Sequence, residues 1–180
     1  MAGKLDGKRV AILVANEGIE QVEMTAPRTA LEEAGATVEL IAPEGGQVQA
    51  FNHLDKADSF PVDQAVSDAD AGSYDALMLP GGVANPDALR MDDDAVSFVR
   101  AFVESERPVA AICHAPWTLA EADVVRGRRM TSWPSLQTDL RNAGADWLDE
   151  EVVVDGNLVT SRKPDDLPAF NEALVRLFAD

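Results

Sequence analysis

Residues 108–117 constrain what this chain can fold into more than any other stretch. An apolar, β-prone run ends there at Cys113 and His114, and a helix-compatible segment begins at Thr118. This order predicts a strand, a tight turn and a helix with the cysteine at the corner, which is the plan of a nucleophile elbow with Cys in place of Ser. Such a corner projects from the C-terminal edge of a sheet, where open α/β folds bind ligands.

The corner position also predicts the chemical state of Cys113, the only cysteine of the chain. A helix N-terminus favours a thiolate over a thiol, so we expect a reactive sulfur with a depressed pKa, in the range of roughly 3.5–7.5. The alternative is an inert structural cysteine, since free cysteines are among the most buried residues. The adjacent histidine and the predicted helix start favour the reactive interpretation.

Length and cysteine usage narrow the class of protein. A chain of 180 residues predicts one domain, residues 1–180, with a sizeable core. A single cysteine makes no internal disulfide, which favours the reducing cytoplasm. The segment before Val10 is mostly polar and the longest apolar run is only Val10–Ala15, so the sequence predicts neither a secretory signal nor a membrane span.

The charge balance argues against one class of partner. The formal net charge is −17, from 32 acidic and 15 basic residues, whereas a nucleic-acid-binding surface needs a basic patch. We therefore expect no nucleic-acid partner and no membrane partner, and we interpret most of the acidic residues as a solvated surface. The densest acidic cluster, Asp92 to Asp94, suits the first turn of a helix and its dipole.

The hydrophobic pattern alternates between strands and helices over most of the chain. We expect strands at 8–15, 37–42, 75–79 and 108–112, helices at 20–34, 85–90, 95–106, 118–122 and 134–144, a hairpin at 152–160 and a final helix at 165–178. Residues 47–71 are less regular and predict only small strands or turns. The opening strand–helix–strand unit favours a parallel sheet with a right-handed crossover, and Asp155–Gly156 is a strong turn signal for the hairpin.

Three of the expected strands end at residues that carry chemistry. The first ends before Glu17 and Glu20, the second at the Gly81–Gly82 pair and the third at Cys113–His114. In a parallel sheet these ends share one edge, so an acid, a glycine pair and a thiol are expected to converge. Cys113 is then the candidate nucleophile, and the backbone N–H groups of Gly82 and His114 are the candidate oxyanion hole, because glycine permits close backbone approach.

Glu20 and the two histidines complete the candidate catalytic groups. A charged carboxylate beside a thiol would raise the thiol pKa, so Glu20 is expected to be protonated and to donate a hydrogen bond to the sulfur. The alternative for Glu20 is an exposed acid at a helix start. Since adjacency in sequence does not assure a Cys–His contact at a turn, His114 is expected to bond an acid and to act as a general base. His53 is a candidate for lining a pocket, although a structural or surface role also explains it.

The candidate substrate contacts are Gly81, Trp117 and His53. Two histidines and one cysteine, scattered along the chain, form no metal-ligand motif. The segment 44–46 lacks the pattern of a phosphate-binding loop or a dinucleotide fingerprint. The sequence therefore predicts neither a metal nor a cofactor.

Several segments together resemble the ThiJ/PfpI superfamily, in its branch of PfpI-type intracellular peptidases and general stress proteins. The resemblance runs from about Lys8 to the C-terminus. The segments that carry it are Ala15-Asn16-Glu17 with Glu20 and Val22-Glu23, the run from Tyr74 to Gly82, Pro86-Asp87-Ala88-Leu89-Arg90, the run from Ala111 to Pro116, and the run from Val152 to Arg162.

The resemblance implies a flavodoxin-like three-layer α/β sandwich with a mostly parallel central sheet. It implies that Cys113 is the nucleophile and that Glu20 is the carboxyl group touching the thiol. It also implies a homo-oligomer, with a dimer as the minimum, in which His114 pairs with an acid of the neighbouring subunit, by position Asp87. Asp87 stands where some relatives carry Glu, which shortens the reach to His114.

Members of this superfamily have been assigned peptidase, glyoxalase and protein-deglycase activities. The resemblance therefore implies a cytoplasmic, stress-related cysteine hydrolase whose Cys113 thiolate attacks a carbonyl, in a peptide bond, an α-oxoaldehyde or the adduct of an α-oxoaldehyde on a protein. The alternative is a non-catalytic redox-sensing or chaperone-like stress protein that uses oxidation of Cys113. The sequence leaves the substrate open among small carbonyl compounds and peptides.

Overall fold

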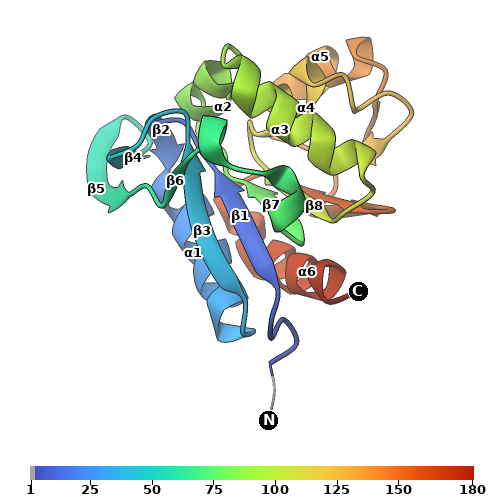
Figure 1. Ribbon diagram of the computed structural model, residues 1–180. Coiled ribbons are helices and arrows are strands. Elements are labelled where there is room, and N and C mark those ends of the chain that lie inside the picture. Colours follow the sequence, from blue (N-terminus) through green and yellow to red (C-terminus); the bar gives the residue numbers. More distant parts are fainter. Residues whose placement is uncertain (1–2) are drawn as a thin grey trace.

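The computed structural model describes residues 3–180 and contains a seven-stranded sheet between two layers of helices (Figure 1). Residues 1 and 2, with which the expected 1–180 domain begins, lie outside the described residues. The strand order is β11-β12-β8-β7-β1-β3-β6. These strands are β1 (Arg9–Leu13), β3 (Thr37–Ala42), β6 (Gln64–Ala65), β7 (Ala76–Leu79), β8 (Val109–Ile112), β11 (Val152–Asp155) and β12 (Leu158–Ser161).

Neighbouring strands of this sheet are parallel, except for the antiparallel pair β11–β12. The arrangement confirms the expected α/β fold with a mostly parallel sheet, and it confirms the hairpin at Asp155–Gly156. From β1 the chain adds β3 and β6 on one side, and then β7, β8 and β12 on the other. The strand order therefore reverses between β1 and β7, the place where open α/β sheets bind ligands.

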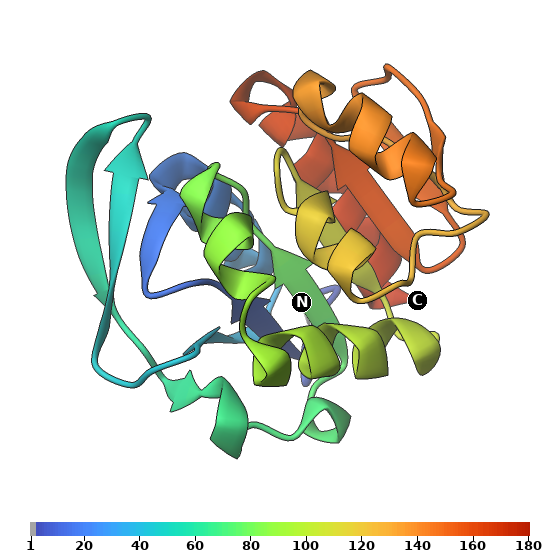
Figure 2. The same ribbon diagram turned by 90° about the horizontal axis from the view of Figure 1, so that it is seen from above.

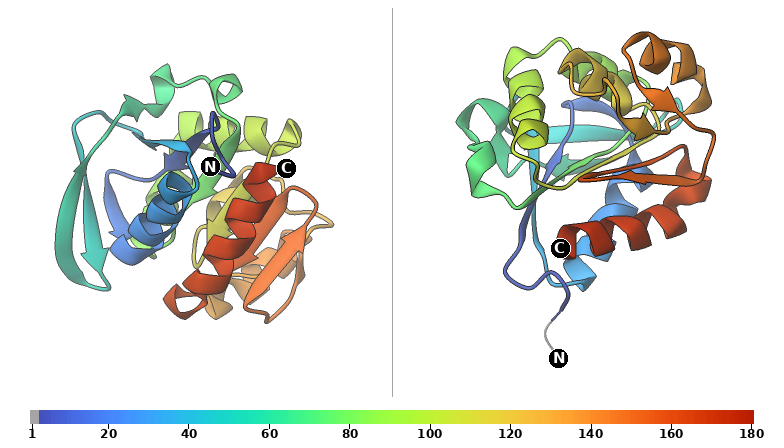
Figure 3. Two further views of the ribbon diagram at one scale, coloured as in Figure 1. Left: turned by 90° about the horizontal axis from the view of Figure 1, so that it is seen from below. Right: turned by 90° about the vertical axis from the view of Figure 1, so that its right-hand side faces the viewer.

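Helices cover both faces of the sheet (Figures 1 and 3). On one face lie α1 (Gln21–Glu33) and α6 (Leu167–Ala179); on the other lie α2 (Ala84–Leu89), α3 (Asp93–Glu104), α4 (Pro116–Glu121) and α5 (Gln137–Asn142). Alternate residues of a strand face the two layers, so in β1 Val10 and Ile12 pack on the α1 side and Ala11 and Leu13 on the other. Because both faces are covered, the central strands are continuous apolar runs in the sequence.

A second, three-stranded sheet stands at the edge of the molecule, at the left of Figure 2. It contains β2 (Glu17–Glu20), β4 (Gln47–Asn52) and β5 (Asp55–Pro61). The expected helix at 20–34 is confirmed as α1, which begins at Gln21. The expected break at 16–19 is wrong, because residues 17–20 form β2, which pairs in parallel with β4. β5 is polar and mostly exposed, so it lacks the alternating pattern that indicates a strand.

Shorter elements complete the chain. β9 (Arg129–Met130) pairs with β10 (Asp146–Trp147), and 3-10 turns occupy Val66–Asp68, Ala71–Ser73, Pro134–Leu136 and Pro164–Asp166. Asp92 accepts a hydrogen bond from the N–H of Ala95 (2.8 Å) and caps α3, as its acidic cluster predicts. No helix within residues 3–180 combines the length and the apolar character needed to cross a membrane.

One buried side chain ties the ends of β1 and β7 together. Asn85, on α2, is fully buried and accepts a hydrogen bond from the N–H of Ala15 (2.6 Å). Its amide group donates to the carbonyl oxygens of Pro80 (2.9 Å) and Gly81 (3.0 Å). Since Ala15 follows β1 and Pro80 follows β7, these bonds fix the width of the crevice where the strand order reverses.

Replacing Asn85 with Ala should lower the free energy of unfolding by about 2–4 kcal/mol, because one buried N–H and two buried carbonyl groups lose their partner. Urea unfolding at neutral pH measures the loss. The matched control is Asn142→Ala, at the exposed end of α5, which should change the free energy by no more than about 0.5 kcal/mol. Equal effects of the two substitutions would contradict the role of Asn85.

Candidate active site

Cys113 lies at the corner between β8 and α4, as the sequence predicts. The four residues of β8 are all buried, and Cys113 follows them with a φ of 64°, in the left-handed region that non-glycine residues rarely adopt. Such strain persists where the surrounding structure holds it, and it is concentrated at functional sites. The N–H of Cys113 donates to the carbonyl of Ser161 (3.1 Å), so the corner remains tied to the neighbouring strand β12.

The thiol lies at the base of a cavity of about 650 Å³ at this edge of the sheet. Only 5% of Cys113 is exposed. The small β2–β4–β5 sheet forms one side of the cavity, and the loop after β7 and the elbow form the other. The remaining lining residues are Glu17, Gly18, Glu20, Glu23, Phe51, His53, Leu54, Gly82, Val83, Ala84, His114, Trp133 and Pro164.

The carboxyl group beside the thiol belongs to Glu23. Its side chain is 1% exposed and interacts with the Cys113 thiol and with the N–H of Gly82. The expected contact between Glu20 and the thiol is therefore wrong. The physical reason is β2, because residues up to Glu20 are extended and the first turn of α1, which carries Glu23, turns toward the end of the sheet.

Glu20 lies on the cavity wall nearer the rim than Glu23. It is half-buried, and its carboxylate accepts a hydrogen bond from the backbone N–H of His53 (3.0 Å). His53 and Leu54 form the exposed turn between β4 and β5. His53 therefore lines the cavity as expected, and Glu20 anchors the tip of the hairpin at the cavity rim.

The glycine pair permits the close packing behind and above the thiol. A Cβ on Gly81 would lie 2.6 Å from the Cys113 Cβ and 2.8 Å from Glu23 Oε2, which is closer than real Cβ contacts. Gly82 has a φ of +84°, and a Cβ there would overlap the carbonyl oxygen of Gly18. Gly81 thus lies behind the thiol, off the cavity wall, whereas the N–H of Gly82 interacts with the sulfur.

Burial controls the protonation of Glu23 and Cys113. It raises the pKa of Glu23 to about 8, so this carboxyl group is protonated at neutral pH. Burial also raises the pKa of the Cys113 thiol, and a charged Glu23 raises it further, while the N–H groups of Gly82 and His114 lower it. The predicted depressed thiol pKa is therefore wrong, because desolvation outweighs the effect of the short helix α4.

His114 lies directly beside the sulfur. Its Nδ1 is 3.1 Å from the Cys113 Sγ, a contact that sequence adjacency alone did not assure. Burial lowers the pKa of His114 to about 4, so its ring is neutral at neutral pH. Trp133 stacks on the ring with 5.7 Å between centroids, and Trp117 meets it edge-on at 5.3 Å. The two indoles shield His114 from water.

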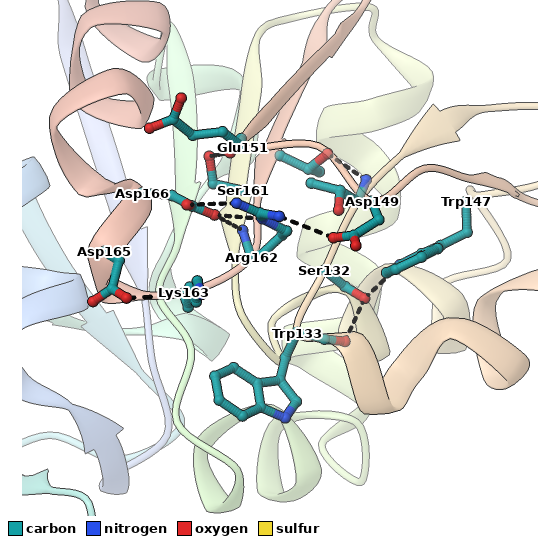
Figure 4. A network of polar contacts seen from close by, with 12 residues as sticks. Ser132, Trp133, Trp147, Asp149, Glu151, Ser161, Arg162, Lys163, Asp165 and Asp166 are labelled. Carbon is teal, nitrogen blue, oxygen red and sulfur yellow. Dashed lines mark hydrogen bonds and ion pairs between the residues drawn. The ribbon is translucent and has the colours of Figure 1, made fainter.

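Hydrogen bonds hold the backbone of Trp133 in place (Figure 4). The Trp147 Nε1 donates to the Ser132 Oγ (2.9 Å), and this hydroxyl donates to the Trp133 carbonyl (2.8 Å). The Trp133 N–H in turn donates to the carbonyl of Cys113 (2.8 Å). The backbone of Trp133 is therefore held from both sides.

The same view shows how the loop after β12 is held (Figure 4). Arg162 donates to both oxygens of the buried Asp166 (2.9 and 3.0 Å) and to Asp149 (2.9 Å). Pro164 lies within this clamped loop and forms part of the cavity wall. The loop therefore presents a fixed apolar surface to the cavity.

Three residues predicted for the site, Gly81, Asp87 and Trp117, lie off the cavity wall. Asp87 is exposed on α2, and Trp117 lies behind His114, where its Nε1 donates to Asp139 (2.9 Å). Trp133 lines the cavity although nothing in the sequence singled it out. Within residues 3–180, no group of three His, Cys, Asp or Glu side chains is placed to hold a metal ion.

A strained cysteine at a strand-to-helix corner, beside a buried carboxyl group, defines a class of α/β sandwich proteins with a cysteine elbow. Residues 8–177 match the DJ-1/PfpI family, and the chain belongs to this family. This membership confirms the resemblance to the ThiJ/PfpI superfamily and the flavodoxin-like sandwich that it implies.

Two named relatives align with this chain over nearly its whole length. The "Putative cysteine protease YraA" of Bacillus subtilis is 46% identical over 170 residues, which cover 94% of this chain and 98% of the relative. The "Protein/nucleic acid deglycase 2" of Escherichia coli is 43% identical over 171 residues, which cover 94% of this chain and 97% of the relative.

A solved structure has the same fold. It is a two-domain protein of Anabaena variabilis with DJ-1/ThiJ/PfpI-like and ferritin-like domains, and it aligns with a TM-score of 0.88 and 37% identity. The alignment covers 94% of this chain and 47% of that longer chain.

The protonation of Glu23 predicts how stability depends on pH. A folded Glu23 keeps its proton to about pH 8, whereas its ordinary pKa is 4.5. The folded chain thus binds more protons between these values, and the free energy of unfolding should fall as the pH rises, by up to about 1.4 kcal/mol per pH unit. The pKa of His114 is about 4 in the folded chain, against an ordinary value of 6.5. Between these two pH values His114 therefore makes the free energy of unfolding rise with pH.

The window from pH 6.5 to 8 therefore isolates Glu23 from His114. Urea unfolding across this window should show a falling stability for the natural chain and no such fall for Glu23→Gln. Glu104→Gln, at the exposed end of α3, is the control and should keep the fall. A slope that survives in Glu23→Gln would show that Glu23 is already ionised at neutral pH.

Proposed function

We propose that this chain is a cysteine-dependent hydrolase that acts on the carbonyl group of a small α-oxoaldehyde or of its adduct on a protein. The observation that carries the proposal is the position of the Cys113 thiol, at the base of a cavity between a protonated Glu23 and a neutral His114. Relatives named as a cysteine protease and a deglycase support a reaction of this kind. A lone nucleophilic thiol also suits a reducing cytoplasm.

The proposed first step follows from the contacts of the sulfur. The thiol proton moves to Nδ1 of His114, 3.1 Å away, and the sulfur electron pair forms a bond to the carbonyl carbon. The carbonyl π electrons move to oxygen, which takes hydrogen bonds from the N–H groups of Gly82 and His114 and a proton from Glu23. At the aldehyde carbon of a free α-oxoaldehyde this addition gives a hemithioacetal. In an adduct the nitrogen leaves that carbon with the His114 proton as the sulfur bonds to it, which gives the same hemithioacetal. The hydrogen on this carbon then moves as a proton to the neighbouring carbonyl carbon, the hydroxyl proton returns to Glu23, and water cleaves the resulting thioester to a 2-hydroxy acid and the free thiol.

The size of the cavity favours small carbonyl compounds and side-chain adducts over peptide bonds. Cys113 is 5% exposed, and a space of about 650 Å³ separates it from the surface. A small aldehyde or a single modified side chain fits such a space, whereas a main-chain peptide bond needs two flanking chain segments to enter with it. Casein is included among the substrates of the test below to detect peptidase activity.

The second candidate function is reversible oxidation of Cys113 in a non-catalytic stress protein. It is favoured by the protonated Glu23 and the N–H groups around the sulfur, which would donate hydrogen bonds to the oxygen of an oxidised cysteine. This function predicts that hydrogen peroxide adds oxygen to Cys113, that a thiol reductant reverses the addition, and that no carbonyl substrate is consumed.

We further propose that the site is shared between two subunits. Asp87 is exposed on the short helix α2, off the cavity wall of its own chain. A symmetric dimer places the same segment of one subunit beside the same cavity of the other. Asp87 would then bond His114 of the second subunit and orient its imidazole, as the acid of a catalytic triad does.

Incubation of the pure protein with methylglyoxal, a methylglyoxal-modified peptide and casein should show turnover of the first two. Cys113→Ser should reduce that turnover at least about a thousandfold, because it removes the nucleophile. The control Glu104→Gln should leave it unchanged. Turnover that survives in Cys113→Ser would overturn the proposed nucleophile, and a natural chain inactive on all three substrates would favour the redox function.

Mixing two inactive variants should restore activity if the site is shared. Cys113→Ser retains Asp87, and Asp87→Ala retains Cys113, so a mixed dimer contains one complete site. Equal amounts with random pairing should recover roughly a quarter of the natural activity. Asp94→Ala, at the exposed start of α3, is the control and should be active alone. A mixture that stays inactive while the subunits demonstrably exchange would contradict the shared site.

A further inference from the structure

We propose that Trp117 is a positioning residue for the general base His114, and that Asp139 holds Trp117 in the place where it does this. The sequence predicts a substrate contact for Trp117, but its indole lies off the cavity wall and against the histidine ring. The inference rests on the proposed function for the role of His114, and adds to it the group that orients this ring within one subunit.

The orientation of the His114 ring decides whether the ring can take the thiol proton. The atom that faces the Cys113 sulfur, at 3.1 Å, is Nδ1. Half a turn of the ring about its bond to Cβ would exchange Nδ1 with the ring carbon Cδ2, which cannot accept a proton. A base that activates a nucleophile is for this reason oriented by a third group.

Aromatic neighbours surround the ring of His114. Within residues 3–180, the ring makes one side-chain hydrogen bond, the contact with the sulfur. Trp133 stacks on the ring with an angle of 20° between the planes, and Trp117 meets it edge-on at 61°. Half a turn of the ring would sweep it through the space that these indoles occupy. Within one subunit, the two indoles therefore keep Nδ1 on the sulfur.

Of the two indoles, that of Trp117 is held by its own side-chain contacts. Trp133 is 37% exposed and borders the cavity, and the hydrogen bonds that hold it are made by its backbone. Trp117 is half-buried, and its Nε1 donates to the Asp139 carboxylate (2.9 Å). The guanidinium of Arg90 lies over the Trp117 ring, 5.6 Å from its centre.

Three helices meet at the Trp117 indole. Trp117 lies on α4, Asp139 lies in the first turn of α5, and Arg90 follows α2 and pairs with Glu121 of α4 (3.5 Å). A hydrogen bond to a carboxylate is stronger than one between neutral groups, and a cation over an indole adds attraction. The indole cannot turn away from His114 without losing both contacts.

Substitutions at Asp139 test this arrangement while the indole stays in the chain. Asp139 is exposed, so Asp139→Ala should leave the core intact. Asp139→Asn keeps an oxygen that accepts from Nε1 and removes only the charge. Asp94→Ala, in the first turn of α3, controls for the loss of an acid at a helix start. Trp117→Phe keeps an aromatic ring and removes Nε1.

The nitrogen NMR shifts of the His114 ring report its orientation without any turnover. At pH 7 the ring is neutral, because burial lowers its pKa to about 4. The natural chain should hold one tautomer, with the proton on Nε2 and Nδ1 toward the thiol, so that the two nitrogen shifts lie far apart. His53, the only other histidine, is exposed on the β4–β5 turn and serves as an internal reference.

A loosened ring exchanges its tautomers, which brings the two nitrogen shifts closer together. Asp139→Ala and Trp117→Phe should produce this change at His114, whereas Asp139→Asn and Asp94→Ala should keep the natural separation. Shifts of His114 that neither Asp139→Ala nor Trp117→Phe alters would overturn the inference. Equal effects of Asp139→Ala and Asp139→Asn would overturn it too, because they would assign the effect to charge at the helix start.

Turnover of methylglyoxal should follow the same order. Asp139→Ala should lower kcat about two- to fivefold and Trp117→Phe about five- to tenfold, a part of what a general base contributes. KM should stay within about twofold, because Trp117 does not border the cavity. A raised KM with an unchanged kcat would show that Trp117 binds the substrate, and would overturn the inference.

The nitrogen shifts and the turnover let the two proposals fail separately. A chain that is inactive on carbonyl compounds, but whose His114 shifts follow the expected order, would overturn the proposed function and leave the positioning of the ring in place. Turnover that depends on Cys113, in a chain whose His114 shifts respond to neither variant, would do the reverse.

Discussion

The contact between the Glu23 carboxyl group and the Cys113 thiol is the interaction on which the rest of the site depends. Both groups are buried, and desolvation is the largest influence on each, so the pKa of both is raised. At neutral pH an uncharged acid therefore lies against an uncharged thiol. His114 is also neutral, and charge develops at the base of the cavity only when the thiol proton moves.

That contact is possible because several backbone segments approach unusually closely. Gly81 has no room for a Cβ between Cys113 and Glu23, and Cys113 itself adopts a left-handed φ. Asn85 holds the ends of β1 and β7 at a fixed separation through three hydrogen bonds. The fold therefore maintains local strain and a buried acid at one edge of the sheet, where a ligand can reach them.

The small β2–β4–β5 sheet gives the cavity its second wall and its charge. It carries Glu17 and Glu20 on β2 and the exposed His53–Leu54 turn at the tip of the hairpin. The central sheet alone would present the elbow on an open edge. The cavity and its acidic side thus depend on a part of the chain that adds little to the apolar core.

The central sheet and the elbow could be predicted from the sequence because their signals are local. Buried strands such as β1 and β8 are apolar runs, and the end of β8 coincides with the only cysteine. The second sheet could be predicted only as small strands or turns, since β4 alternates buried and exposed residues but its partner β5 is polar and carries no alternating pattern.

The sequence does not distinguish Glu20 from Glu23 as the acid beside the thiol, although it predicts the start of α1 to within one residue. Glu20 ends the extended strand β2, and the first turn of α1 brings Glu23 to the sulfur. The prediction of a depressed thiol pKa is wrong for a related reason. The sequence does not show how deeply Cys113 is buried, because its burial depends on packing between distant segments. Trp133 contacts His114 across 19 positions of sequence, a contact that no local pattern encodes.

The most direct test of this account is the infrared signature of a protonated carboxylic acid at position 23. The difference spectrum between the natural chain and Glu23→Gln should contain the carbonyl stretch of a protonated acid at pH 6, and this band should disappear as the pH rises through about 8. A difference spectrum that contains only carboxylate bands at pH 6 would contradict the account, because an ionised Glu23 has no proton to donate to the sulfur or to a substrate oxygen.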